Sequence, residues 1–253
     1  MAAKSSIFSI IGKAFSATFS HLGVVLCVVL AYGLILASID SLVYDAVVGS
    51  SGSDSTGYKQ EDLIQLVLSW AGVNLAIEIL LGPILAAVAV YVGRQHVLQR
   101  KDGSIYKAIN FALSRYKRVF LPHMGAQVSI QVGMIIIVPG VLFLMQYAFV
   151  DAIACLEEEK SPLNRSKRLT RGRRKSIVLL FLPWLFLSQV IGFVDLWALS
   201  QSAWILIATK SAAVMVYFIM VVAFFMLYDE RTRQKKKRKK AASPAPESEP
   251  SAT

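Results

Sequence analysis

Polar and ionisable side chains interrupt several long apolar stretches of this sequence at helical spacing. Three pairs of them are separated by four positions: Asn74 and Glu78, Gln127 and Gln131, and Tyr147 and Asp151. Residues four apart share one face of a helix. A charge in the middle of a bilayer costs about 2.5–3.5 kcal/mol on insertion scales, so such residues normally face the interior of a bundle. We therefore predict that these six residues form a polar intramembrane site.

Glu78 and Asp151 are the two acids of this predicted site, and both should lie in the middle-to-inner part of the membrane. No lysine or arginine falls at their depth in the apolar stretches. Two interpretations follow, in which the carboxyl groups are protonated or line a polar cavity. A third is that the polar faces only form hydrogen bonds between helices.

A second group of ionisable residues is expected nearer the outer face. Asp195 lies in one apolar stretch and Lys210 in the next, with Asp40 at a comparable depth. Opposite charges inside a membrane normally pair with each other. The sequence predicts an Asp195–Lys210 ion pair that ties two helices together.

Known catalytic and metal-binding patterns are missing from the sequence. It has no His-Glu-x-x-His helix, no Gly-x-Ser-x-Gly turn and no Gly-x-x-x-x-Gly-Lys loop. Its three histidines, His21, His96 and His123, are far apart, and Cys27 and Cys155 are its only cysteines. We predict no disulfide framework, no metal site, no cofactor and no enzymatic activity.

Composition identifies the class of protein that must position these residues. Of the 253 residues, 55% are hydrophobic and 17% are charged, and the mean hydropathy is +0.56. About 20 mainly apolar residues are needed to cross ~30 Å of hydrocarbon. We predict an all-α, polytopic transmembrane bundle with about six spans, at residues 21–44, 63–92, 119–138, 141–156, 177–199 and 204–228. Pro139-Gly140 is expected to mark the turn between the third and fourth, and the first is expected to be a retained anchor, not a cleaved signal peptide.

The distribution of charge supports an even number of spans. If the N-terminus is cytoplasmic, 25 of the 27 lysines and arginines fall on the cytoplasmic side, leaving Lys59 outside and Lys210 within a span. This asymmetry is the one that orients membrane proteins. Merging the third and fourth spans would move the basic cluster at 160–175 outside. The sequence therefore predicts a bacterial inner-membrane protein with both termini in the cytoplasm. Its net charge of +11 is then explained by the orientation of the chain in the membrane, which argues against nucleic acid as a partner.

Three cytoplasmic segments carry further expectations. Two segments are predicted to lie in the membrane interface or to dock on the bundle. They are residues 1–20 and a second amphipathic pattern of Ile105, Ile109, Ala112, Leu113, Tyr116 and Phe120. Residues 231–253 are predicted to be a disordered tail, basic at first and then rich in Ala, Ser, Pro and Glu.

A further cytoplasmic segment follows Glu157-Glu158-Glu159 and is strongly basic. Serine followed by proline, as at Ser161-Pro162, is typical of a helix start. A glycine such as Gly172 commonly follows a helix end. The segment is a candidate site for anionic lipid headgroups, or otherwise a simple positive anchor. Its candidate residues are Arg165, Lys167, Arg168, Arg171, Arg173, Arg174 and Lys175.

This part of the chain also resembles a known family. The resemblance lies in three segments: Val138-Pro139-Gly140-Val141, Ser161-Pro162 and Ser166-Lys167-Arg168-Leu169-Thr170-Arg171-Gly172. They look like segments of bacterial integral-membrane proteins related to the membrane domain of glycerophosphoryl diester phosphodiesterases. The match covers about forty residues, with departures at Asn164 and at Gln146-Tyr147. The resemblance implies a membrane architecture. It does not imply phosphodiesterase activity, because the soluble catalytic barrel of the fused proteins has no counterpart in this sequence.

These observations favour a non-enzymatic membrane subunit, scaffold or lipid-organising protein. Its candidate partners are the bilayer, anionic headgroups and another membrane protein. The alternative is a transporter or lipid-handling protein with a polar path at Glu78 and Asp151. A membrane-embedded lipid enzyme is the least favoured of the three. The sequence specifies no oligomeric state.

Overall fold

The computed structural model describes residues 6–48, 60–100, 103–136, 138–198 and 202–242. Within these ranges the chain is helical and has no strand. The predicted all-α bundle is therefore confirmed. Its helices are α1 (Ile7–Ser20), α2 (Leu22–Val48), α3 (Gln60–Val97), α4 (Ile105–Met134), α5 (Val138–Tyr147), α6 (Val150–Leu156), α7 (Pro162–Thr170), α8 (Arg174–Ala198) and α9 (Ala203–Ala242).

Among the described residues, five stretches are long and apolar enough to cross a membrane: Leu22–Ala46, Gly72–Val97, Val138–Leu156, Arg174–Asp195 and Ala203–Lys235. Four of them fall on α2, α3, α8 and α9, where the sequence predicted the first, second, fifth and sixth spans. Large apolar side chains such as Leu30, Leu34 and Phe186 lie exposed on these helices, as expected where a helix faces lipid. The chain is a multi-pass membrane protein.

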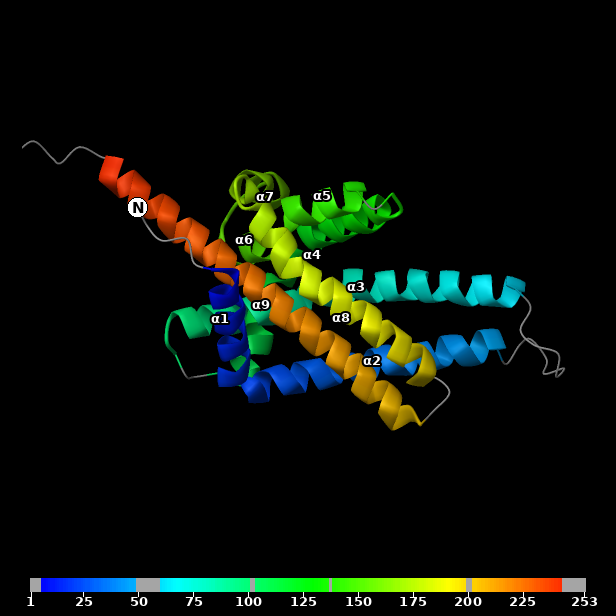
Figure 1. Ribbon diagram of the computed structural model, residues 1–253. Coiled ribbons are helices and arrows are strands. Elements are labelled where there is room, and N and C mark those ends of the chain that lie inside the picture. The colour runs from blue at the N-terminus through cyan, green and yellow to red at the C-terminus, as the bar shows by residue number, and fades with distance from the viewer. Residues whose placement is uncertain (1–5, 49–59, 101–102, 137, 199–201, 243–253) are drawn as a thin grey trace, which may run out of the picture.

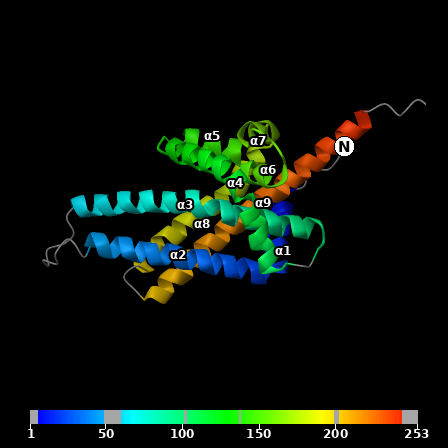
Figure 2. The same cartoon turned by 180° about the vertical axis from the view of Figure 1, so that it is seen from behind.

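The long helices are arranged around α9. In Figures 1 and 2, α2 and α3 run side by side, α9 crosses them at an angle, and α8 lies alongside α9. The segment of α9 from Val221 to Tyr228 is buried throughout, which makes this helix the centre of the core. The first helix, α1, lies across the ends of the long helices and packs Ile10 and Ala14 against them.

Of the two remaining predicted spans, the fourth lies within the stretch Val138–Leu156, and the third is not among the five stretches. The predicted third span falls mainly in the second half of α4, which ends at Met134. The predicted fourth span is broken at residues 148–149 into α5 and α6, of 10 and 7 residues. At 1.5 Å per residue these pieces are only about 15 Å and 10 Å long, so neither crosses a bilayer alone.

Helices α4 and α5 pack against each other as a hairpin. Its turn comes directly after Met134 and lies toward the same end of the molecule as the ends of α2 and α8 (Figures 1 and 2). Pro139-Gly140 is not the turn itself, because both residues belong to α5. Gly140 instead lies where the two helix backbones come closest, opposite Gly133 and Met134.

Replacing Gly140 with alanine should therefore destabilise the hairpin. The added Cβ would lie 2.6 Å from the backbone nitrogen of Met134, and backbone cannot move aside as a side chain can. Overpacking of this kind typically costs about 1–3 kcal/mol. Gly125→Ala is the matched control on α4, where the Cβ would lie at an ordinary 3.5 Å from Leu163. Thermal unfolding of the detergent-purified variants checks this, and equal midpoints for the two would contradict it.

The two amphipathic segments do not behave alike. Helix α1 begins at the predicted place, capped by the Ser6 hydroxyl, and exposes Phe8 and Phe19 on its outer side. The second segment is no separate helix, because it is continuous with the rest of α4. It packs through Ala108 and Ala112, so the predicted apolar face is only partly buried and its members Ile105, Ile109 and Leu113 are exposed.

The cytoplasmic segments also differ in part from their predictions. Helix α7 occupies Pro162–Thr170 as expected, and Gly172 has the left-handed φ of +83° that favours glycine after a helix. The basic tail is not disordered from residue 231, since α9 continues without a break to Ala242. The remainder of the predicted tail, residues 243–253, lies outside the described residues.

Candidate functional site

His123 lies inside the bundle between two carboxyl groups from different helices. Its side chain, on α4, is 1% exposed. Nδ1 is 2.9 Å from Oδ1 of Asp151 on α6, and Nε2 is 3.9 Å from Oε1 of Glu78 on α3. The expectation that Glu78 and Asp151 have no basic partner is therefore wrong, because a single imidazole serves both. We refer to these three residues as the His123 cluster.

Two further groups complete the hydrogen bonding of Glu78. The side-chain amide of Gln127, one turn after His123 on α4, donates to Oε1 at 3.0 Å. The hydroxyl of Tyr217, on α9, is a second hydrogen-bonding neighbour of the same carboxyl group. The site thus joins α3, α4, α6 and α9, and the i, i+4 spacing of the polar residues is what aims them at one another.

The backbone of α3 has to come close to His123 to form this cluster. A Cβ at Gly82 would lie 2.7 Å from Nε2 of His123 and 3.3 Å from Oε1 of Glu78. The next residue, Pro83, has no N–H to donate to the helix at this level. The Gly-Pro step therefore makes room for the imidazole, and Nε2 has no hydrogen-bond partner among the described residues.

A cavity of about 370 Å³ opens beside the cluster, between the α4–α6 segment and helices α8 and α9. Its polar wall is formed by His123, Gln127, Gln131, Tyr147, Asp151, Ser188, Gln189 and Tyr217. The rest of its wall is apolar and includes Ile130, Leu144, Phe181, Trp184, Met220 and Phe224. The cavity is therefore amphipathic, and its volume is within the usual range for small-molecule sites.

The wall of this cavity reaches the surface on two neighbouring elements. Gln131 on α4 and both Leu185 and Gln189 on α8 line the cavity and are exposed. Their helix neighbours Val132 and Phe186 are also exposed, at 61% and 72%. The cavity therefore meets the surface where α4 and α8 expose these side chains.

A smaller cavity of about 220 Å³ adjoins the first. Trp184, Ser188 and Tyr217 line both cavities and so form the partition between them. Glu78 lines only the second cavity and Asp151 only the first, so the two acids of the His123 cluster face different spaces. Asp195 lies in the wall of the second cavity as well.

The structure brings five of the six predicted site residues to the His123 cluster or the larger cavity. Glu78, Gln127 and Asp151 belong to the polar network, and Gln131 and Tyr147 line the cavity. Asn74 is the exception. It is half-buried on α3, one turn before Glu78, and outside the walls of both cavities. His123 was visible in the sequence as the first member of a stripe with Gln127 and Gln131, but its partnership with Asp151 joins different helices and has no sequence signal.

The predicted Asp195–Lys210 pair is present, and it has a third member. Nζ of Lys210 lies 3.1 Å from Oδ2 of Asp195 and 2.5 Å from Oδ2 of Asp40. Asp40 is 1% exposed. A single ammonium group on α9 therefore holds carboxylates of both α2 and α8, so that one lysine ties three helices together.

The basic cluster around α7 is only partly available for lipid headgroups. Arg165 pairs with Glu157 at 2.9 Å, and Arg173 is 5% exposed and pairs with Glu230 at 3.0 Å. Both guanidinium groups are therefore engaged within the protein, which leaves them less available to headgroups. Lys167 packs over the ring of Tyr147, with Nζ 5.3 Å from the ring centroid. The exposed members are Arg168, Arg171, Arg174 and Lys175.

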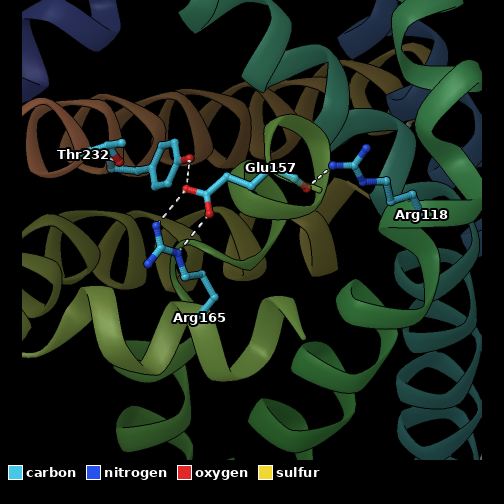
Figure 3. A network of polar contacts seen from close by, with 5 residues as sticks. Arg118, Glu157, Arg165 and Thr232 are labelled. Carbon is cyan, nitrogen blue, oxygen red and sulfur yellow. Dashed lines mark hydrogen bonds and ion pairs between the residues drawn. The ribbon is translucent and has the colours of Figure 1, made fainter. Parts of the chain in front are cut away.

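Glu157 joins four parts of the chain at this end of the molecule (Figure 3). Its carboxylate accepts hydrogen bonds from Arg165 of α7 and, at 2.8 Å, from the hydroxyl of Tyr228 of α9, while its backbone carbonyl accepts from Arg118 of α4. The hydrogen bond from Arg165 to Glu157 raises the pKa of Arg165, which is charged in any case. Arg115 also donates to the carbonyl of Cys155, at 2.9 Å. The end of α6 thus receives two arginines, the favourable charge for a helix C-terminus.

The described residues hold no recognised metal site. Among the described residues, no cluster of three or more His, Cys, Asp or Glu side chains is arranged to hold a metal ion. Comparison of the chain with protein-family models, with curated proteins and with solved structures gives no match. Function must therefore be argued from the cavity and its polar wall.

Proposed function

We propose that the protein binds an amphipathic small molecule or lipid from the bilayer and moves or presents it through the cavity beside His123. The observation that carries this proposal is the exposure of the cavity wall at Gln131 of α4 and Gln189 of α8, where we propose that a ligand enters from the bilayer. A ligand that enters there can leave its apolar part among Phe181, Trp184 and Phe224. Its polar head group can then form hydrogen bonds with the polar wall of the cavity beside His123.

The cavity favours this role over that of a scaffold. A purely structural bundle gains stability by filling space of this kind with apolar side chains, since cavities lower the free energy of unfolding. Here the space is retained beside a buried histidine and two acids, which are costly to place in a membrane. Retention of both an opening and a polar cluster is the pattern of a binding site.

We propose a non-enzymatic role for the same site. Ser188 is the single serine, threonine or cysteine among the described residues that line the larger cavity. Its hydroxyl donates to the carbonyl of Leu185 on its own helix, at 2.8 Å. An activated serine would instead donate to the histidine. We therefore assign Asp151 and His123 to recognition of the ligand.

We also propose that the protein resides in a bacterial inner membrane with both termini in the cytoplasm. The proposal rests on the concentration of lysine and arginine at one end of the bundle, beyond α7 and along the final turns of α9. Arg168, Arg171, Arg174 and Lys175 would then face anionic headgroups. The helix after Ser161-Pro162 and the left-handed Gly172 support the proposed relation to the membrane domain of glycerophosphoryl diester phosphodiesterases.

Native mass spectrometry of the protein in mild detergent tests the proposed role. We expect the wild-type protein to retain one amphiphile or lipid per chain, and the double variant Glu78→Gln, Asp151→Asn to lose it. Asp229→Asn is the matched control, because Asp229 pairs with exposed Arg233 on α9, away from the cavity. A protein partner present in a fixed ratio, with no bound amphiphile, would support the scaffold role and overturn the proposal.

A further inference from the structure

The charges in the wall of the larger cavity restrict the kind of ligand it can hold. None of its described lining residues is a lysine or an arginine. The wall contains one acid, Asp151, and one imidazole, His123, which are already paired with each other through Oδ1 and Nδ1. Asp151 is nevertheless 24% exposed, so its carboxylate is accessible from the space beside it.

Anionic ligands would find little complementary charge there. Phosphate and carboxylate groups are recognised in proteins mainly by arginine and lysine, whose N–H groups form charge-assisted hydrogen bonds with them. The nearby arginines are held elsewhere: Arg115 and Arg118 donate to carbonyl groups at the end of α6, and Arg165 pairs with Glu157. The imidazole of His123 faces two acids, Asp151 and Glu78.

Aromatic rings make up much of the remaining wall. Phe181 and Trp184 come from α8, and Tyr217, Phe224 and Phe225 come from α9. Tyr147 also lines the cavity, although one face of its ring is already occupied by Lys167. Organic cations bind to the faces of such rings, most strongly to tryptophan, and the attraction grows when water is excluded. A carboxylate beside several aromatic rings is a combination that favours a positive charge carried on an apolar body.

We infer that the ligand of this cavity is an amphipathic organic cation, with its charge near Asp151 and its apolar part against the rings of α8 and α9. The inference rests on the proposed function and names the chemical class of its ligand. The exposed opening between α4 and α8 fits this class, since an apolar cation accumulates in the bilayer before it reaches the site.

A matched pair of probes tests the inference in the wild-type protein. Tetraphenylphosphonium and tetraphenylborate have the same shape and opposite charge. In equilibrium dialysis against the detergent-purified protein, we expect the phosphonium to bind saturably, at least about tenfold more tightly than the borate. Equal binding of the two ions, preferred binding of the borate, or no saturable binding of either would overturn the inference.

Variants then locate the binding site. Asp151→Asn should weaken phosphonium binding at least about tenfold, and Trp184→Leu should weaken it without removing the acid, whereas Asp229→Asn should leave it unchanged. Asp151→Glu, which restores the charge, should recover most of the affinity. Unchanged binding in both Asp151→Asn and Trp184→Leu would place the cation elsewhere and refute the inference. If native mass spectrometry still finds a neutral or anionic amphiphile in the wild type, the proposed function stands and only the ligand class fails.

Discussion

Replacing Lys210 with methionine should lower the free energy of unfolding by about 3–5 kcal/mol, the usual cost of removing one partner from a buried ion pair. The ammonium group lies 2.5 Å from Asp40 and 3.1 Å from Asp195, and its loss leaves two carboxylates inside the bundle without a counter-charge. This contact joins helices α2, α8 and α9. The measurement is thermal or denaturant unfolding of the protein in detergent, with the yield of folded protein as a second readout.

The effect of Lys210→Met has a specific rescue. If stranded carboxylates cause the loss, adding Asp40→Asn and Asp195→Asn should restore most of the stability, because the amides carry no charge. Lys210→Arg keeps the charge and should cost less than methionine. A triple variant as unstable as Lys210→Met alone would show that packing around the lysine stem matters more than its charge.

Replacing His123 with leucine should disable the candidate site and destabilise the protein. The substitution leaves Asp151 without its 2.9 Å partner and removes the one imidazole next to Glu78. A buried polar group that loses its partner costs about 1–3 kcal/mol, and more when it is charged. We expect a lower unfolding midpoint together with loss of the co-purified amphiphile, both measured on the same preparation.

Two comparisons separate these effects of His123→Leu. His96→Leu removes a histidine near the end of α3, away from both cavities, and should keep the bound amphiphile. Adding Asp151→Asn to His123→Leu should recover stability but not binding, because the stranded charge is gone and the recognition pair is still missing. Retention of the amphiphile by His123→Leu at wild-type stoichiometry would argue against the site.

The sequence predicted the class of fold well, because long apolar stretches and one-sided charge follow directly from the physics of a bilayer. It placed α2, α3, α8 and α9, and also the short helix after Ser161-Pro162. It did not reveal that the apolar stretch Val138–Leu156, which contains the predicted fourth span, is interrupted at residues 148–149 between α5 and α6. Hydropathy averages over such a break, so length alone could not reveal it.

The candidate site was predicted in parts and not as a whole. Spacing of four residues identified Glu78, Gln127 and Asp151, because each helix aims its own polar face at the interior. Which faces meet depends on how the helices pack, and no pattern within one helix records that. This is why His123 was not recognised as a partner of both acids, and why Asp40 was not joined to Lys210. The same reason applies to Arg165 and Arg173, which were expected to face lipid and instead pair with Glu157 and Glu230.

If the cavity opens to the bilayer between α4 and α8, as we propose, the occupancy of the site depends on the concentration of ligand in the membrane. A cavity that fills from the bilayer samples the concentration of ligand in the membrane, which for an amphiphile is far higher than in water. Each methylene group adds about 0.8 kcal/mol to that partitioning before any contact with protein is made. The chain length of a ligand is therefore selected largely by the membrane, and its head group is left for the residues around Asp151 to discriminate. Such a site can be weak in contacts and still be well occupied.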